Sequence, residues 1–307
     1  MKIGVDIGGT KCAVVLGDEK NILRKIQFET KDPTNTIYNI EKAISAMGKN
    51  VDSIGISCGG PLDAKSGVIL SPPNLIGWDR IPIVSRLSNI FKVPAYLCND
   101  ADACALAEHR FGIGRGTQNM IFLTFGTGMG AGLILNGRLY SGTNGMAGEI
   151  GHVRMENYGP TGYGKQGSFE GFCSGGGIAQ LGKTKALELL QQGKKLPWCQ
   201  SVKDIDQITA KFLAERAHEG DELAREVYRI SAEMLGRGVS VLIDVLNPEM
   251  VIIGSVYQRA KDLMEPYMDE VIAKESLFAS RTRCIVVPSA LGDQIGDYGA
   301  LAVAYGV

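Results

Sequence analysis

Short apolar runs, each bounded by glycine, proline or polar residues, occur along the whole chain and predict buried β-strands. The strands expected on this pattern lie at 3–7, 12–17, 22–29, 53–57, 94–98, 119–125, 131–135, 138–140, 250–254 and 284–287. Apolar residues at helical spacing separate these runs, and helices are expected at 35–47, 83–91, 101–111, through most of 175–247, at 258–274 and from 297 onward. Strands and helices in this mixture predict an α/β protein.

One arrangement of elements occurs twice. An apolar strand runs into a Gly/Thr turn, a second apolar strand follows the turn, and a further strand completes the unit. The first copy contains Asp6-Ile7-Gly8-Gly9-Thr10 and the second contains Thr124-Phe125-Gly126-Thr127-Gly128. We interpret the repetition as two related halves, each beginning with a β-hairpin whose turn faces a shared cleft.

Composition narrows the functional class. The chain has 307 residues, enough for about two domains, and its formal net charge is -1, which gives no electrostatic reason to expect nucleic acid or an anionic membrane as a partner. Seven scattered cysteines without a CxxC pair are typical of a reduced, cytoplasmic protein. Neither a cleavable leader nor an apolar run of the ~18 residues needed to span a bilayer is expected.

The Gly/Thr turns are candidates for phosphate binding. Such turns expose backbone N–H groups and hydroxyls without bulky side chains in the way, and concavities of this kind bind phosphate oxygens. Either turn alone could be an ordinary hairpin, but two matching turns in one chain favour the phosphate interpretation.

Two other nucleotide motifs do not fit. Gly126, Gly128 and Ala131 match the spacing of a dinucleotide fingerprint, but that fingerprint must begin a helix, and here a strand and an Asn136-Gly137 hairpin follow. Gly193-Lys194 lacks the upstream glycine and the Ser/Thr of a Walker A sequence. An NAD-dependent dehydrogenase is therefore a weak rival, and it would be recognised by cofactor-dependent absorbance.

Carboxylates and a histidine supply candidate chemistry. Asn99-Asp100 lies where a strand gives way to a helix, so Asp100 could be a general base for a substrate hydroxyl or simply the N-cap of the helix. Glu149 and His152 are three residues apart in a glycine-rich stretch and could bind sugar hydroxyls, or His152 could ligate a metal. The alternative is a surface glutamate and a histidine with ordinary partners. His109 and His218 lie in charged helical stretches and are expected to be solvated.

Taken in order, these stretches resemble the ROK family (repressor, ORF, kinase) of sugar kinases and regulators. The resemblance extends over essentially the whole chain and rests on Asp6-Ile7-Gly8-Gly9-Thr10-Lys11, Pro73-Asn74-Leu75, Asn99-Asp100-Ala101, Gly126-Thr127-Gly128-Met129-Gly130, Gly148-Glu149-Ile150-Gly151-His152 and Leu291-Gly292-Asp293. It implies a two-lobed actin-like ATPase (ribonuclease H-like) fold with duplicated hairpin-containing domains. The expected lobes are 1–114, joined by a C-terminal helix at about 296–307, and 115–295.

The resemblance also implies residue roles. Asp100 matches the catalytic base, and Asp6 would act near Mg²⁺. The residues expected at ATP are Asp6, Gly8, Gly9, Thr10, Lys11, Thr127, Gly128 and Gly254. The residues expected at the sugar are Gly60, Asn74, Asn99, Asp100, Glu149, His152 and Glu170.

This chain departs from the family at its zinc motif. Thr161, Tyr163 and Ser168 occupy the three positions where many members have cysteine. Neutral hydroxyls are poor substitutes for thiolates at a structural zinc site. Cys173 alone cannot rebuild one, so we expect no zinc and a loop held by packing, with His152 serving the substrate alone.

The function implied is ATP-dependent phosphorylation of a hexose, expected at O6 of glucose or a related sugar. Gly59-Gly60, where many glucokinase-like members have proline in place of one glycine, leaves an N-acetylhexosamine such as N-acetylmannosamine as the alternative. A non-catalytic sugar sensor is the rival from another class. The first hairpin begins at residue 3, which leaves no room for the helix-turn-helix of a ROK repressor. The family tends to form dimers, so a homodimer is expected.

Overall fold

The computed structural model describes residues 1–48 and 50–306 and divides into two compact units. Unit 1 comprises Met1–Phe122, Gly132–Ala147 and Ser289–Val307, and unit 2 comprises Leu123–Ala131 and Gly148–Pro288. Each unit is described by itself. The lobes expected from the sequence, 1–114 with about 296–307 and 115–295, remain a prediction.

The first five-stranded sheet lies in unit 1 and has the order β3-β2-β1-β4-β7. Its strands are β1 (Lys2–Ile7), β2 (Lys11–Gly17), β3 (Ile22–Glu29), β4 (Ser53–Cys58) and β7 (Ala95–Asn99). β1 pairs antiparallel with β2 and parallel with β4, so Ile7 lies opposite both Cys12 and Cys58. The carboxyl ends of β1, β4 and β7 therefore meet at one edge of the sheet, where Gly8, Gly59 and Asp100 follow.

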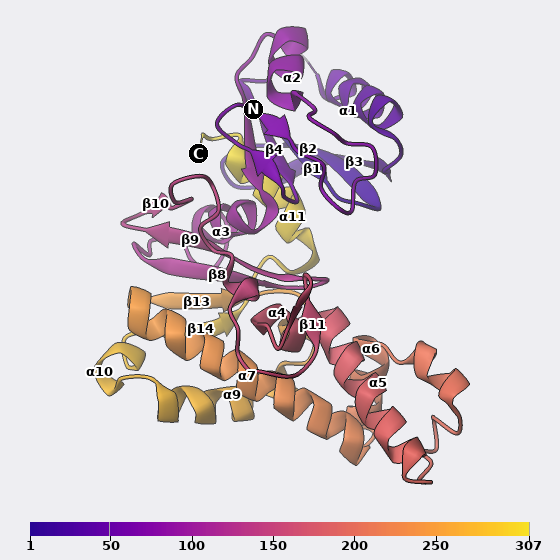
Figure 1. The fold of residues 1–307 in the computed structure, drawn as a ribbon. Coiled ribbons are helices and arrows are strands. Elements are labelled where there is room, and N and C mark those ends of the chain that lie inside the picture. Colours follow the sequence, from indigo (N-terminus) through magenta and orange to yellow (C-terminus); the bar gives the residue numbers. More distant parts are fainter. Residues whose placement is uncertain (49, 307) are drawn as a thin grey trace. The chain divides into compact units, whose positions relative to one another are not determined.

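Helices complete unit 1 (Figure 1). They are α1 (Pro33–Met47), α2 (Ile83–Phe91), α3 (Asp100–Arg110) and α11 (Ile295–Val303), with a 3-10 turn η3 (Gly292–Gln294) and a small hairpin of β5 (Leu62–Asp63) and β6 (Val68–Ile69). α11 packs against β1, β4 and α3. Gly55 lets the helix come this close, because a Cβ at Gly55 would overlap the backbone of Ala304.

The second five-stranded sheet repeats the first in order, as β10-β9-β8-β13-β14. Its strands are β8 (Met120–Phe125), β9 (Met129–Leu135), β10 (Arg138–Leu139), β13 (Met250–Ile253) and β14 (Ile285–Pro288). In each sheet the central strand, β1 or β8, has its hairpin partner on one side. On its other side lie two strands that come later in the chain, β4 and β7 or β13 and β14. The duplicated hairpins predicted from the sequence are thus confirmed.

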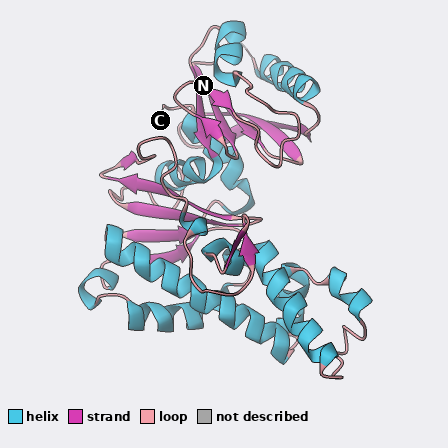
Figure 2. Ribbon diagram, viewed as in Figure 1, coloured by secondary structure: helices cyan, strands magenta, loops and turns pink. Residues whose placement is uncertain are grey.

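Unit 2 is rich in helices (Figure 2). Besides its part of the second sheet, unit 2 contains the following elements: η1 (Ile150–His152), β11 (Thr161–Gly162), β12 (Lys165–Gln166), α4 (Phe169–Phe172), α5 (Gly175–Gln191), η2 (Val202–Gln207), α6 (Ala210–His218), α7 (Glu222–Leu246), α8 (Val256–Arg259), α9 (Lys261–Glu275) and α10 (Phe278–Arg281). The single helix predicted at 258–274 is interrupted, because Ala260 leaves helical geometry at φ -126° and separates α8 from α9. Among the described residues, no helix combines the length and apolar character that a membrane crossing requires.

Candidate active site

The first glycine turn joins β1 to β2 in unit 1. The Gly8 N–H donates to the Lys11 carbonyl at 3.1 Å, and the Thr30 hydroxyl donates to the Gly8 carbonyl at 2.6 Å. Gly9 lies against the 73–75 loop, because a Cβ there would come within 2.7 Å of the Asn74 carbonyl oxygen. The structure therefore brings Asn74, expected at the sugar, to the turn expected at the phosphates.

Asn99 and Asp100 lie where β7 gives way to α3, and Asn99 is the residue that caps the helix. Asn99 is the N-cap of α3, and its Oδ1 accepts from the Ala101 N–H at 2.9 Å. Asp100 is the first residue of the helix, and its Oδ1 also approaches the Ala101 N–H at 2.9 Å. Because Asn99 supplies the cap, the Asp100 carboxylate is not required for it.

Asp100 combines access with a crowded setting. Its side chain is exposed to solvent, while loss of hydration raises the pKa of its carboxyl, opposed by the Ala101 N–H. Protein atoms therefore surround much of the carboxyl, but solvent still reaches it. Gly59 borders it without a side chain, since a Cβ at Gly59 would lie 3.8 Å from Asp100 Oδ2. A raised pKa is favourable for a carboxylate that must accept a proton.

Asp6 lies in an acidic cluster with Asp100 and Asp297. Burial, followed by repulsion from Asp297 and Asp100, raises the pKa of Asp6 to about 6, while Lys25 and Lys11 oppose the rise. Asp297 is buried and bonds the Lys25 ammonium at 2.6 Å.

Asp297 and Lys25 were not predicted as site residues from the sequence. The available signal was Gly296-Asp297 at the start of the last helix. Gly296 is where α11 approaches Asp6, because a Cβ at Gly296 would lie 2.7 Å from Asp6 Oδ2.

The residues around Asp6 fit a divalent cation. A partly exposed carboxylate with excess negative charge beside it attracts one, and Mg²⁺ is usually held by one or two carboxylates, waters and substrate phosphates. No group of three or more His, Cys, Asp or Glu side chains that could hold a metal ion occurs within residues 1–48 and 50–306. This combination suits a cation that arrives with a nucleotide.

The second glycine turn joins β8 to β9 in unit 2. The Gly126 N–H donates to the Gly128 carbonyl at 3.1 Å, and Thr127 is exposed. The Glu170 carboxylate lies against this turn, accepting from the Met129 N–H at 3.0 Å. A Cβ at Gly128 would lie 2.7 Å from Glu170 Oε2, so a side chain there would displace the Glu170 carboxylate from the turn.

Glu149 precedes η1 and His152 is its last residue, and both are exposed. Gly151 between them packs closely on the Met129 carbonyl, and a Cβ at Gly151 would lie 3.3 Å from the Glu170 Cβ. Unit 2 therefore gathers the second glycine turn, Glu170 and η1 in one region.

Gly254 also joins this region, since its N–H donates to the Leu123 carbonyl at 3.0 Å. The next residue, Ser255, has a left-handed φ of 54° and lies near Gly126. Strained backbone of this kind is frequent at functional sites. One contact near this turn was not predicted from the sequence. The Gly175 N–H donates to the Gly126 carbonyl at 2.8 Å. The glycine run at 175–177, at the N-terminus of α5, was the signal for it.

The side chains at the three positions where many family members have zinc-binding cysteines are not suited to hold a metal. Thr161 belongs to the β11–β12 hairpin, and the side chain of Tyr163, at its tip, is exposed. The Ser168 hydroxyl caps α4 by accepting from the Gly171 N–H at 3.1 Å. Cys173 donates its thiol proton to the Ser231 carbonyl at 3.3 Å.

The remaining histidines differ from each other. His218 is exposed and its Nε2 lies 2.8 Å from Asp262 Oδ2. His109 was expected to be solvated, but this expectation is wrong in part. Its ring is half-buried, with Nε2 2.9 Å from the Thr117 carbonyl, because the 112–117 segment folds back along α3.

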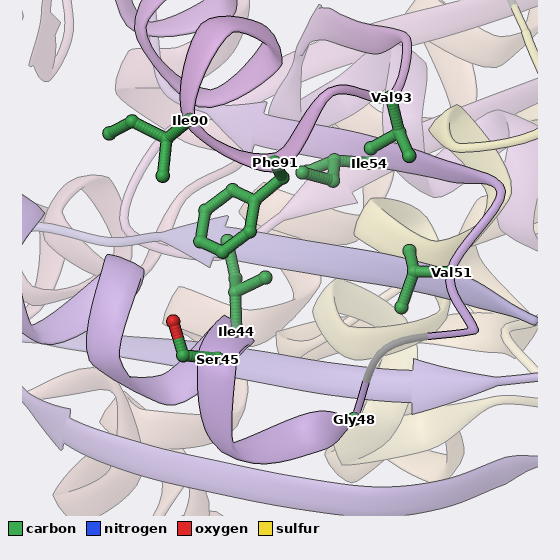
Figure 3. Close-up of a pocket in the computed structure, with 8 residues that line it drawn as sticks. All are labelled: Ile44, Ser45, Gly48, Val51, Ile54, Ile90, Phe91 and Val93. Atoms are coloured by element: carbon green, nitrogen blue, oxygen red, sulfur yellow. The ribbon is translucent and has the colours of Figure 1, made fainter.

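A cavity of about 290 Å³ lies in unit 1 away from these groups (Figure 3). It is lined by Ile44, Ser45, Gly48, Val51, Ile54, Ile90, Phe91 and Val93. Ile54 is near the amino end of β4, whereas Asp100 follows the carboxyl end of the neighbouring β7. The cavity is therefore at the opposite end of the sheet from the candidate chemistry.

Comparison with known proteins identifies the family. A glucokinase from Thermotoga maritima is 30% identical over 312 residues, covering 98% of this chain and 96% of that protein. A xylose repressor from Caldicellulosiruptor bescii is 30% identical, covering 94% of this chain and 69% of that protein. A ROK family glucokinase from Streptomyces griseus, solved with glucose and AMPPNP, matches with a TM-score of 0.79 at 29% identity over 100% of this chain and 99% of that one.

The structural relatives have the actin-like ATPase fold, and the two sheets of like order described above agree with it. The ROK family profile covers residues 2–306. The chain belongs to the ROK family.

Proposed function

We propose that this protein transfers the γ-phosphoryl group of ATP to a hydroxyl of a hexose, with O6 of glucose or a related sugar as the acceptor. The observation that carries the proposal is Asp100, a reachable carboxylate of raised pKa that the neighbouring cap residue leaves available. Glucokinase relatives that match over nearly their whole length add support.

In the proposed reaction, Asp100 accepts the proton of the sugar hydroxyl as its oxygen attacks the γ-phosphorus. The bond between that phosphorus and the β–γ bridging oxygen breaks, and ADP leaves. Catalysis in this class depends mainly on positioning and on electrostatic stabilisation of the transferring group. Mg²⁺, when bound with ATP near Asp6, would neutralise charge on the phosphates.

The remaining site residues receive roles by the same proposal. We assign the ATP phosphates to the two glycine turns, through Gly8, Gly9, Thr10, Lys11, Thr127 and Gly128, and the adenosine to Gly254. We assign the sugar hydroxyls to Gly60, Asn74, Asn99, Glu149, His152 and Glu170. Exposed turn N–H groups and exposed polar side chains are suited to these tasks.

An N-acetylhexosamine is the second candidate substrate. Gly60 is exposed, and a Cβ placed on it would come within 3.4 Å of Asn99 Nδ2. The missing side chain leaves space beside Asn99, which a bulkier 2-substituent such as an acetamido group could fill.

The test is ADP release across glucose, mannose, allose, fructose, N-acetylglucosamine and N-acetylmannosamine. Sugar-dependent ADP release with one of the hexoses is expected. Preference for an N-acetylhexosamine would favour the second candidate. Sugar binding without any ADP release would favour a non-catalytic sensor, the role consistent with the repressor relative, and would contradict the kinase proposal.

We also propose a cytoplasmic homodimer. The seven cysteines are free, as expected in a reducing compartment. Exposed apolar side chains gather where α7 and α10 meet, since Leu277 N donates to Asp244 on α7. Val245 is 72% exposed and Phe278 is 70% exposed, and exposed apolar groups of this kind are suited to a subunit contact. Size-exclusion chromatography with light scattering tests this.

A further inference from the structure

The loop at 153–168 lacks the cysteines of a zinc site, yet its two ends are joined. The Phe169 N–H donates to the Val153 carbonyl at 2.8 Å, and Arg154 forms an isolated β-bridge with Ser168. Inside the loop, β11 pairs antiparallel with β12. Backbone hydrogen bonds therefore close this loop without any contribution from cysteines.

Side chains from this loop and from α5 fix the hairpin. Gln180 on α5 bonds the Thr161 backbone twice, donating to its carbonyl at 2.9 Å and accepting from its N–H at 3.0 Å. The Arg154 guanidinium donates to the Gln166 carbonyl at 2.8 Å. The hairpin is thus anchored on both strands.

Two hairpin residues also contact His152. The Lys165 ammonium donates to the His152 carbonyl at 2.7 Å. The Tyr163 ring lies edge-on to the imidazole, with centroids 6.4 Å apart and an interplanar angle of 77°, a favoured arrangement of aromatic pairs. One contact holds the backbone of His152 and the other holds its ring.

From these contacts we infer that Lys165 and Tyr163 are positioning residues for His152. The inference rests on the proposed function to the extent that His152 binds the sugar. Binding sites need their side chains held by supporting contacts to keep a productive geometry. Here a charge-assisted hydrogen bond and an aromatic pair supply that support.

The test compares Lys165→Met with Arg154→Met. Both variants remove a cation of this loop that donates to a backbone carbonyl, but only Lys165 bonds to His152. Lys165→Met is expected to raise KM for the sugar roughly tenfold, as loss of one charge-assisted hydrogen bond would, while kcat changes less than about threefold. Lys165→Arg keeps a donor and should restore most of the affinity. Arg154→Met removes one support of the hairpin but no contact to His152, so it should raise KM clearly less than Lys165→Met does.

A spectroscopic arm does not depend on activity. The chain has three histidines, so the imidazole nitrogen signals can be assigned with His109 and His218 as internal references. Lys165→Met and Tyr163→Leu should shift or broaden the His152 signals alone.

Equal effects of Lys165→Met and Arg154→Met, or unmoved His152 signals, would overturn the inference. If no sugar is phosphorylated even by the parent protein, the proposed function fails, while the His152 signals still decide the positioning role.

Discussion

Asp100 is the residue on which catalysis is expected to depend. The variant Asp100→Asn keeps the shape of the side chain but cannot accept the hydroxyl proton, so kcat should fall by about 10²–10⁴-fold. Sugar affinity, measured by calorimetry, should change little because the amide still fits. As a control, Asp63→Asn alters an exposed carboxylate in the β5–β6 hairpin and should leave kcat unchanged. Undiminished turnover in Asp100→Asn would remove Asp100 from the mechanism.

The raised pKa of Asp100 has a consequence for the pH profile. The carboxyl must be ionised to act as a base, so kcat/KM for the sugar should decline as the pH falls through its raised pKa, above the range of an ordinary aspartate. The measurement is kcat/KM for the sugar against pH at saturating ATP. Activity that stays constant down to the pKa of an unperturbed carboxyl would contradict the assignment.

Asp6 illustrates an opposition between stability and function. Its folded-state pKa of about 6 exceeds the 3.8 of an ordinary aspartate, so the ionised group destabilises the folded protein fully above pH 6, and the penalty disappears as the pH falls toward 4. Asp6→Asn should therefore stabilise the ligand-free protein by about 3 kcal/mol at pH 8, although activity is expected to be lost. Thermal unfolding at pH 8 and pH 5 should show the gain shrinking at the lower pH.

Asp18→Asn is the control for that measurement. The Lys20 and Asn21 N–H groups hold the pKa of Asp18 below its usual value, so loss of its charge should bring no stabilisation. If both variants gain the same stability, the cause is the change in the protein's net charge and not the acidic cluster at Asp6.

At the scale of elements, Glu108 ties α3 to the segment that leads into the last helix. Its buried carboxylate accepts from the Ser289 hydroxyl at 2.6 Å and from three backbone N–H groups, those of Ala290, Leu291 and Ile113. Glu108→Ala leaves these donors unpaired and should reduce the free energy of unfolding by about 3 kcal/mol or more.

A surface ion pair provides the comparison. Glu41 bonds Arg86 at 2.6 Å on an exposed face of unit 1, and Glu41→Ala should cost less than about 1 kcal/mol. Urea unfolding of the two variants measures the difference. If the two losses are alike, Glu108 does not anchor the 289–291 segment.

The elements were largely predictable because apolar runs and glycine stops mark them directly. The repeated hairpins followed from Gly8-Gly9 and Gly126-Gly128, since glycine is the residue that such turns favour. Contacts between distant segments were not predictable in the same way. Gly296 allows a close approach before Asp297 but does not show that the partner is Asp6, and nothing near Gln180 indicates its bonds to Thr161, because only the packing of whole elements brings these residues together. Atomic positions were likewise required to show that Asn99 is the N-cap of α3.

At the scale of the whole molecule, the absence of the zinc cysteines makes a prediction about metal removal. Treatment with EDTA should leave Tm unchanged, and the purified protein should contain well below one zinc per chain, because backbone and side-chain hydrogen bonds close the 153–168 loop. Elemental analysis and calorimetry measure the two quantities. A relative that retains the cysteines should lose Tm under the same treatment. A fall in Tm for the present protein would indicate a metal bound elsewhere.

The packing of α11 on β1 and β4 affects how the chain can fold during synthesis. Lys25 and its partner Asp297 are separated by 272 residues, so the first sheet leaves the ribosome long before the helix that covers it. Until α11 emerges, part of the apolar surface of that sheet stays open to water and to other nascent chains. Unit 2, most of which is one continuous stretch, can fold earlier. Slow translation near the 3′ end of the message would prolong this uncovered state and increase dependence on chaperones.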